Sequence, residues 1–121
     1  MEQTPSTPPL QIERLAEVSG GDVEFEKELL AEFLRTAPVL VENAAQAVAT
    51  GDAPAALRAA HTLKGASGSI GAGPLAEASR FLEETCREGR VQEGGPWVAQ
   101  IRSRFEDLAG FVLGQYGDMA A

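Results

Sequence analysis

The sequence has little of what disulfides and metal sites are built from. Its 121 residues contain one histidine, His61, and one cysteine, Cys86. A single cysteine cannot form a disulfide within the chain. Two such residues are also too few for a structural zinc site, which takes four ligands, mostly cysteine and histidine. We therefore expect no metal site, and Cys86 is most simply a small core residue.

Positive charge, long apolar runs and phosphate-binding loops are also scarce or missing. The chain has 10 Lys and Arg against 18 Asp and Glu, a formal net charge of −8, whereas nucleic-acid binding depends on clustered basic side chains. No run approaches the roughly 20 apolar residues of a membrane span, and the Thr- and Pro-rich start lacks the regions of a signal peptide. No GxxxxGK[ST] loop is present, so ATP binding has no support. We expect a cytoplasmic monomer that binds neither nucleic acid nor membrane and has no kinase activity of its own.

Apolar residues recur at helical spacing along most of the chain, and no convincing alternating strand pattern is present. The pattern predicts an all-α fold, an antiparallel four-helix bundle with an additional short N-terminal helix packed across one end. The bundle domain is expected over residues 10–116, between a flexible N-terminal tail (1–9) and a C-terminal tail (117–121). The expected helices begin near Leu10, Asp22, Asp52, Pro74 and Pro96. Asp22 and Asp52 are natural N-caps.

One residue interrupts this pattern inside the second helix. Pro38 has no backbone N–H to donate and its ring clashes with the preceding turn. We expect a kink or a short break there, with the helix resuming through Val41 and ending at Gly51.

The stretch around His61 is unusual for a helix. At 100° per residue, Ala59, Leu63, Ala66 and Ile70 share one side, and His61 lies opposite, near Lys64, Gly65 and Gly68. Each glycine inside a helix costs about 1 kcal/mol relative to alanine. Two glycines beside an exposed histidine indicate that something large approaches the ring closely, although they could instead mark tight helix packing.

The same stretch resembles the signature of a known family. The run His61-Thr62-Leu63-Lys64-Gly65-Ala66-Ser67, followed by Ile70-Gly71-Ala72, is similar to that of histidine-containing phosphotransfer (HPt) proteins. Gly21-Asp22 followed by Glu28-Leu29-Leu30 and Phe33 look like the second helix of that family, and Leu82-Glu83-Glu84 like its fourth. The resemblance covers all but about the first nine residues.

The resemblance implies a phosphorelay intermediate. Such a protein accepts a phosphoryl group on His61 from a receiver-domain aspartate and passes it to another receiver domain. The implied partners are receiver domains of response regulators and hybrid histidine kinases. It implies no cofactor in this chain, because Mg²⁺ belongs to the partner receiver domain.

A neutral imidazole can attack phosphorus when its outer nitrogen, Nε2, is unprotonated and Nδ1 holds the proton. An acceptor beside Nδ1 arranges this best. Glu83, 22 residues after His61, matches the glutamate with that role in the related phosphotransfer domain of chemotaxis kinases, and Glu84 is the alternative. Lys64, one turn after His61, would screen the phosphoryl charge, and Arg58 is a second candidate for this.

An acidic surface offers little charge with which to hold a partner. We therefore expect a receiver to dock on an apolar patch beside His61, formed by Leu57 with Ile12 or Leu15 of the first helix and bordered by Arg58 and Gly68. The chain starts at Met1 and ends soon after its last helix, which favours a stand-alone module.

Two alternative functions stay open. One is the phosphotransfer domain of a chemotaxis-type histidine kinase, phosphorylated directly by an ATP-binding domain. The other is a non-catalytic helical adaptor that binds receivers, which the presence of both His61 and Lys64 disfavours.

Overall fold

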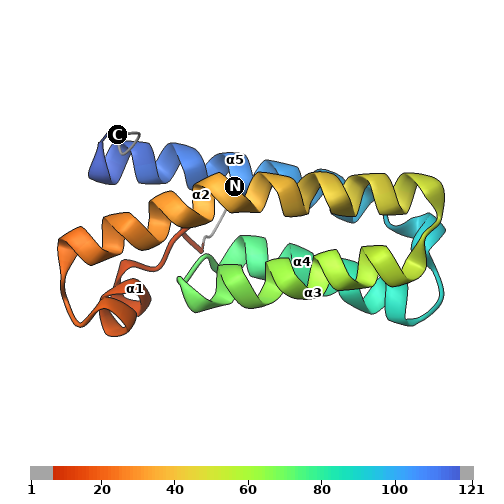
Figure 1. Ribbon diagram of the computed structural model, residues 1–121, viewed down its shortest axis with the longest axis horizontal. Coiled ribbons are helices and arrows are strands. Elements are labelled where there is room, and N and C mark those ends of the chain that lie inside the picture. The colour runs from red at the N-terminus through yellow and green to blue at the C-terminus, as the bar shows by residue number, and fades with distance from the viewer. Residues whose placement is uncertain (1–6, 118–121) are drawn as a thin grey trace, which may run out of the picture.

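The computed structural model describes residues 7–117, which form five α-helices and one short 3₁₀ turn. The elements are α1 (Ile12–Ser19), α2 (Val23–Thr50), α3 (Ala53–Ser69), α4 (Gly73–Arg87), η1 (Val91–Glu93) and α5 (Gly95–Tyr116). Helices α2 to α5 run alternately in opposite directions, and α1 lies at one end of the bundle (Figure 1). Residues 7–117 contain no strand. The all-α bundle with an additional short helix is therefore confirmed. Most of the two predicted tails, residues 1–6 and 118–121, lies outside the described residues, and the domain boundaries stay a prediction.

The two predicted N-caps are confirmed. The carboxylate of Asp22 accepts a hydrogen bond from the Phe25 backbone N–H at 3.1 Å, and that of Asp52 accepts one from Ala55 at 3.1 Å. Each bond satisfies a backbone donor that the first turn of a helix leaves free. Asp52 therefore fixes where α3 begins, and with it the position of His61 along the bundle.

Of the two outcomes expected at Pro38, the short break is wrong, because α2 continues through this residue as one helix of 28 residues. Pro38 lies on the exposed side of α2, whereas Ala37 and Val41 on either side of it are buried in the core. A proline on the solvent side disturbs the backbone hydrogen bonds where water can reach them. Packing of the buried face then offsets the cost and holds the helix together.

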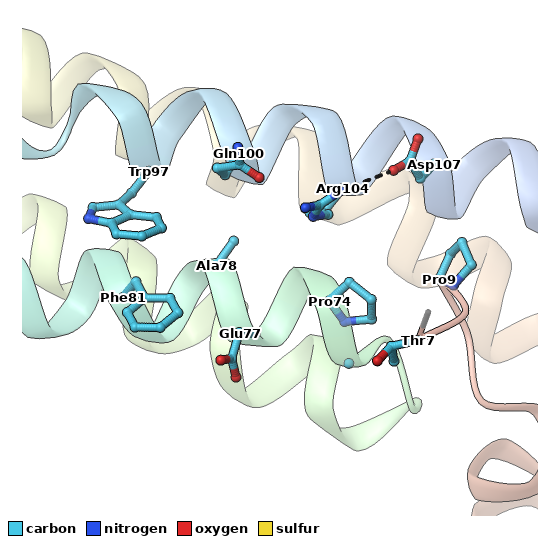
Figure 2. Close-up of a pocket in the computed structure, with 11 residues that line it drawn as sticks. Thr7, Pro9, Pro74, Glu77, Ala78, Phe81, Trp97, Gln100, Arg104 and Asp107 are labelled. Carbon is cyan, nitrogen blue, oxygen red and sulfur yellow. Dashed lines mark ion pairs between the residues drawn. The ribbon is translucent and has the colours of Figure 1, made fainter. Parts of the chain in front are cut away.

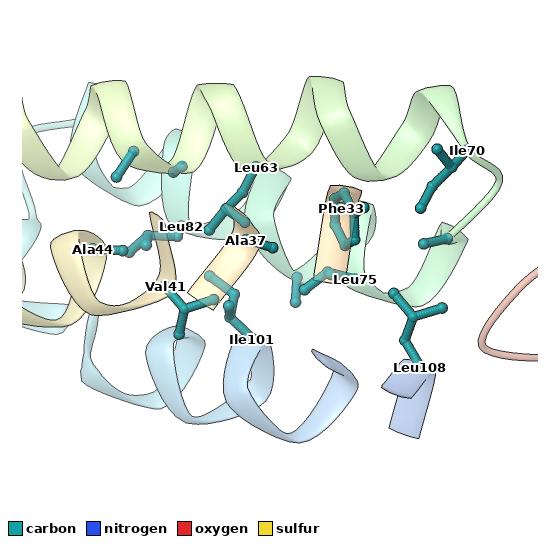
Figure 3. Packing of buried hydrophobic residues seen from close by; sticks show 14 of the residues in the cluster. Phe33, Ala37, Val41, Ala44, Leu63, Ile70, Leu75, Leu82, Ile101 and Leu108 are labelled. Carbon is teal, nitrogen blue, oxygen red and sulfur yellow. The ribbon is translucent and has the colours of Figure 1, made fainter. Parts of the chain in front are cut away.

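Buried aliphatic and aromatic side chains from all four long helices meet along the axis of the bundle (Figure 3). Helix α3 packs against α4 and α2, which leaves its remaining side facing outward. The largest core side chains include Leu30, Phe33, Leu63, Leu75, Leu82, Ile101 and Leu108. No helix within residues 7–117 is long and apolar enough to cross a membrane.

Helix α1 is fixed against the turn between α3 and α4. The Gln11 backbone N–H donates to the carbonyl of Gly71 at 2.9 Å, and Leu15 is fully buried. Gly71 has a φ of +87°, and a Cβ on it would lie 2.9 Å from the Gln11 carbonyl oxygen. A residue with a side chain would therefore be strained there and would push α1 away.

Candidate functional site

His61 lies on the outward side of α3 and contacts a buried carboxylate on α4. Its Nδ1 is 2.7 Å from Oε2 of Glu83. The His61 side chain is 67% exposed, whereas that of Glu83 is 1% exposed. Glu84, the alternative partner, instead accepts a hydrogen bond from Arg80 at 2.6 Å. Of the two carboxylates considered from the sequence, Glu83 is thus the one beside the ring.

Two cations share the Glu83 carboxylate with His61. Lys64 Nζ lies 2.7 Å from Oε1, and Arg87 Nη2 lies 2.9 Å from Oε2. Burial by itself raises the pKa of Glu83, but hydrogen bonds from Lys64, His61 and Arg87 outweigh it and lower the pKa to about 2. Glu83 is therefore ionised at any pH at which the protein is expected to work.

The charge of Glu83 determines how the ring of His61 is protonated. An ionised carboxylate can only accept hydrogen bonds, so Nδ1 must carry the proton in the 2.7 Å contact. In the neutral ring, Nε2 then holds a free lone pair. Since most of the side chain is exposed, an electrophile can reach this lone pair. The site is a nucleophilic imidazole in a fixed orientation.

The two glycines beside His61 face open space. A Cβ added to Gly65 or Gly68 would meet no atom within 4 Å, and neither residue has a positive φ. By contrast, a Cβ on Gly94 would lie 2.9 Å from Leu82 Cδ1, which makes Gly94 a packing glycine. Tight packing within this chain therefore does not explain Gly65 and Gly68. Because neither residue has a side chain, the surface next to the imidazole is free of steric obstruction there.

The other residues expected at the site lie in different surroundings. Arg58 is exposed, but it borders a groove between α2 and α3 together with Asn43 and Gln46, away from Glu83. Leu57 and Ile12 are each half-buried and keep some surface for contact. The expectation that Leu15 contacts a partner is wrong, because this side chain anchors α1 in the core.

Arg87 is a residue of the site that the sequence alone does not single out. It lies one turn after Glu83 on α4, the spacing at which opposite charges on a helix pair. That spacing was the available signal, but many exposed pairs share it. Only the burial of Glu83 beside His61 gives the pair its significance.

A groove larger than the one beside Arg58 lies elsewhere on the molecule, between α4 and α5 (Figure 2). Its volume is about 870 Å³, and Phe81 and Trp97 stack in its wall with ring centroids 4.7 Å apart. Neither His61 nor Glu83 lines it. The nucleophile is thus on an open surface and not in this groove.

Within residues 7–117, no group of three or more His, Cys, Asp and Glu could hold a metal ion.

Comparisons with known proteins find a matching family model and similar solved structures. The Hpt domain family model matches residues 28–111 of the chain. The crystal structure of histidine-containing phosphotransfer protein B (HptB) from Pseudomonas aeruginosa PAO1 is similar, with a TM-score of 0.80 and 28% identity over 90% of this chain and 96% of that one. The HPT domain of a sensor hybrid histidine kinase from Shewanella shares the fold, with a TM-score of 0.76 and 19% identity over 91% and 97% of the two chains. A search of curated proteins finds no significant match.

Proposed function

The chain belongs to the Hpt domain family, and we propose that His61 is the residue on which it carries a phosphoryl group. The protein is a phosphorelay histidine phosphotransfer intermediate. Three observations together support the assignment of His61. It is the one histidine in the chain, it is exposed, and its Nδ1 contacts an ionised carboxylate at 2.7 Å.

The transfer follows from the protonation of this ring. The Nε2 lone pair attacks the phosphorus of an aspartyl phosphate in a receiver domain, the N–P bond forms, and the P–O bond to the aspartate breaks. The aspartate leaves as a carboxylate, and Nδ1 keeps its proton, so the ring gains a positive charge. The carboxylate of Glu83, already in contact with Nδ1, stabilises that charge. Transfer to the next receiver is the same step in reverse.

Lys64 has two tasks in this proposal. Its ammonium group contacts Glu83 Oε1 at 2.7 Å, and it has further N–H donors that are free to face a phosphoryl group on the neighbouring ring. The side chain is 36% exposed. At such an accessible position we expect its effect on the phosphoryl charge to be modest, about 0.3 to 1 kcal/mol.

The partners are receiver domains. We propose that they belong to response regulators and hybrid histidine kinases and dock over Gly65 and Gly68, with Leu57 and Ile12 as apolar contacts at the edge. The receiver supplies Mg²⁺ for the transfer. In this proposal the chain has no autokinase activity and acts as a monomer in the cytoplasm.

Two other functions compete with this proposal. The adaptor alternative gives no reason for a nucleophilic histidine held by a buried carboxylate. The chemotaxis-type alternative differs in the donor, which would be an ATP-binding domain and not a phosphorylated receiver. The identity of the donor therefore distinguishes it from the proposed relay.

The test is transfer from phosphorylated receiver domains to the wild-type protein and to His61→Gln. Label on the wild type should be lost in acid and survive in base, as expected of phosphohistidine, and His61→Gln should take up none while circular dichroism shows the same helix content. If His61→Gln were labelled as fast as the wild type, another residue would be the acceptor and the proposal would fail.

A further inference from the structure

The contact with Glu83 that orients the His61 ring also favours protonation of that ring. A carboxylate within about 4 to 6 Å of an imidazole favours the protonated ring, and the buried Glu83 lies 2.7 Å from Nδ1. A fully protonated ring has no lone pair on Nε2 and cannot attack phosphorus. With His61 and Glu83 alone, the orienting contact would remove the nucleophile over part of the pH range.

Arg87 is placed to counter this effect. Its guanidinium donates to Glu83 Oε2, the same oxygen that accepts from His61 Nδ1, at 2.9 and 2.7 Å respectively. Two nitrogens that contact one oxygen at these distances lie within about 6 Å of each other, close enough for one charge to disfavour another. A guanidinium also stays charged at every relevant pH. Arg87 therefore opposes a positive ring both directly and by neutralising Glu83.

The other charged groups do not cancel the effect of Arg87 on the protonation of the ring. On α3, Lys64 neutralises the second oxygen of Glu83, and Arg58 lies one turn before His61. Where Arg58 lines its groove, α2 contributes the uncharged Asn43 and Gln46. Other charged groups on the packed helices pair among themselves: on α4, Arg80 with Glu77 and Glu84, and between α2 and α5, Glu42 with Arg102. Among residues 7–117, Glu83 is the carboxylate in contact with the imidazole.

We propose that Arg87 is a positioning residue that acts through Glu83 to keep the His61 imidazole neutral, and so able to accept a phosphoryl group, at lower pH than the His61–Glu83 pair alone would allow. This rests on the proposed function of His61 as the phosphoryl acceptor. Arg87 is the clearer choice than Lys64 because it shares the oxygen that His61 uses. Its side chain is 60% exposed, so replacing it opens no cavity in the core.

The experiment compares wild type, Arg87→Met and Arg87→Lys. Arg90→Met is the matched control, because it removes the same charge just beyond the end of α4 from an arginine that pairs with Glu88 and Glu93. Two quantities are measured across a pH series. The first is the NMR signal of the imidazole ring, which is unambiguous because the chain has one histidine. The second is the rate at which phosphoramidate, a small phosphoryl donor, phosphorylates the protein, expressed relative to wild type at each pH.

In Arg87→Met, the midpoint of the ring titration and that of the pH–rate profile should both move to higher pH by about 0.5 to 1 unit. Acceptance relative to wild type should then be about 3- to 10-fold lower at low pH than at high pH. Arg87→Lys should restore most of the shift, and Arg90→Met should behave as wild type. Unmoved midpoints in Arg87→Met, or a loss of rate that is the same at every pH, would overturn the inference. If wild type took no phosphoryl group on His61, the proposed function would fail, and the ring titration alone would still decide the effect of Arg87 on protonation.

Discussion

Replacing Gly65 with glutamine should make the protein more stable and, at the same time, a worse phosphoryl acceptor. Gly65 lies inside α3, is exposed, and has nothing within 4 Å of where a Cβ would stand. Removing a glycine from such a position should stabilise the helix by about 0.5 kcal/mol, since glutamine is a good helix former. For a domain of this size, that corresponds to a rise in Tm of about 2 °C.

The loss in transfer comes from steric hindrance between the new side chain and a receiver. Glutamine at position 65 would stand on the open surface beside His61, where the partner must bring its aspartyl phosphate to Nε2. Displacing the reacting atoms by about 1 Å can slow a reaction on the order of 100-fold. We expect a loss of that size when the donor is a phosphorylated receiver domain. Phosphoramidate is small enough to pass the side chain and should lose far less.

The assay therefore measures thermal unfolding and transfer from both donors. Gly110→Gln is the matched control, because Gly110 is an exposed glycine within α5 that also has nothing within 4 Å of a Cβ. Gly110→Gln should be stabilised by a similar amount and should accept phosphoryl groups from both donors at wild-type rates. Wild-type rates from the receiver in Gly65→Gln, or an equal loss with both donors, would refute the claim that Gly65 provides room for a large partner.

Three further predictions concern acid stability, docking and the backbone. Glu83 has a pKa of about 2 in the folded protein against an ordinary 4.5, so the stability it contributes is complete above about pH 4.5 and lost as the pH falls towards 2. Urea unfolding should find wild type up to about 3 kcal/mol more stable than Glu83→Gln at neutral pH, and a gap that does not shrink in acid would contradict the pKa. Leu57→Asp should weaken binding of a cognate receiver in titration calorimetry without changing the lifetime of phosphohistidine in the isolated protein. An unchanged Kd would place the docking surface elsewhere, on the side of α4 around Ala76 and Arg80. Pro38→Ala should stabilise α2 by about 1 to 3 kcal/mol without affecting transfer, and a destabilised variant would show that the chain needs the proline.

Local features of the sequence predict most of this fold. Helical spacing of apolar residues locates the helices, and Asp22 and Asp52 mark where two of them begin. Pro38 is different because packing decides whether the helix breaks there. A backbone rule favours a break there, but the rule does not include the buried neighbours that hold α2 together.

The site is only partly predictable from the sequence, because the burial of a side chain does not follow from local patterns. The family resemblance indicates that Glu83 lies beside His61, and the helical wheel indicates that the ring and Gly65 face outward. Neither conveys how deeply a side chain is buried. Leu15 is apolar on a short amphipathic helix, a pattern equally typical of a docking residue and of the core anchor that it is. Arg87 resembles any surface arginine until Glu83 is known to be buried.

In the proposed chemistry, the phosphoryl group is carried on Nε2 of His61 while Nδ1 keeps its proton bonded to Glu83. The most direct test is ³¹P and ¹⁵N NMR of the protein after phosphorylation by a receiver domain, because the coupling between phosphorus and the ring nitrogens identifies which nitrogen is modified. We expect phosphorus on Nε2 and a proton on Nδ1. Phosphorus on Nδ1, or on any residue other than His61, would contradict it.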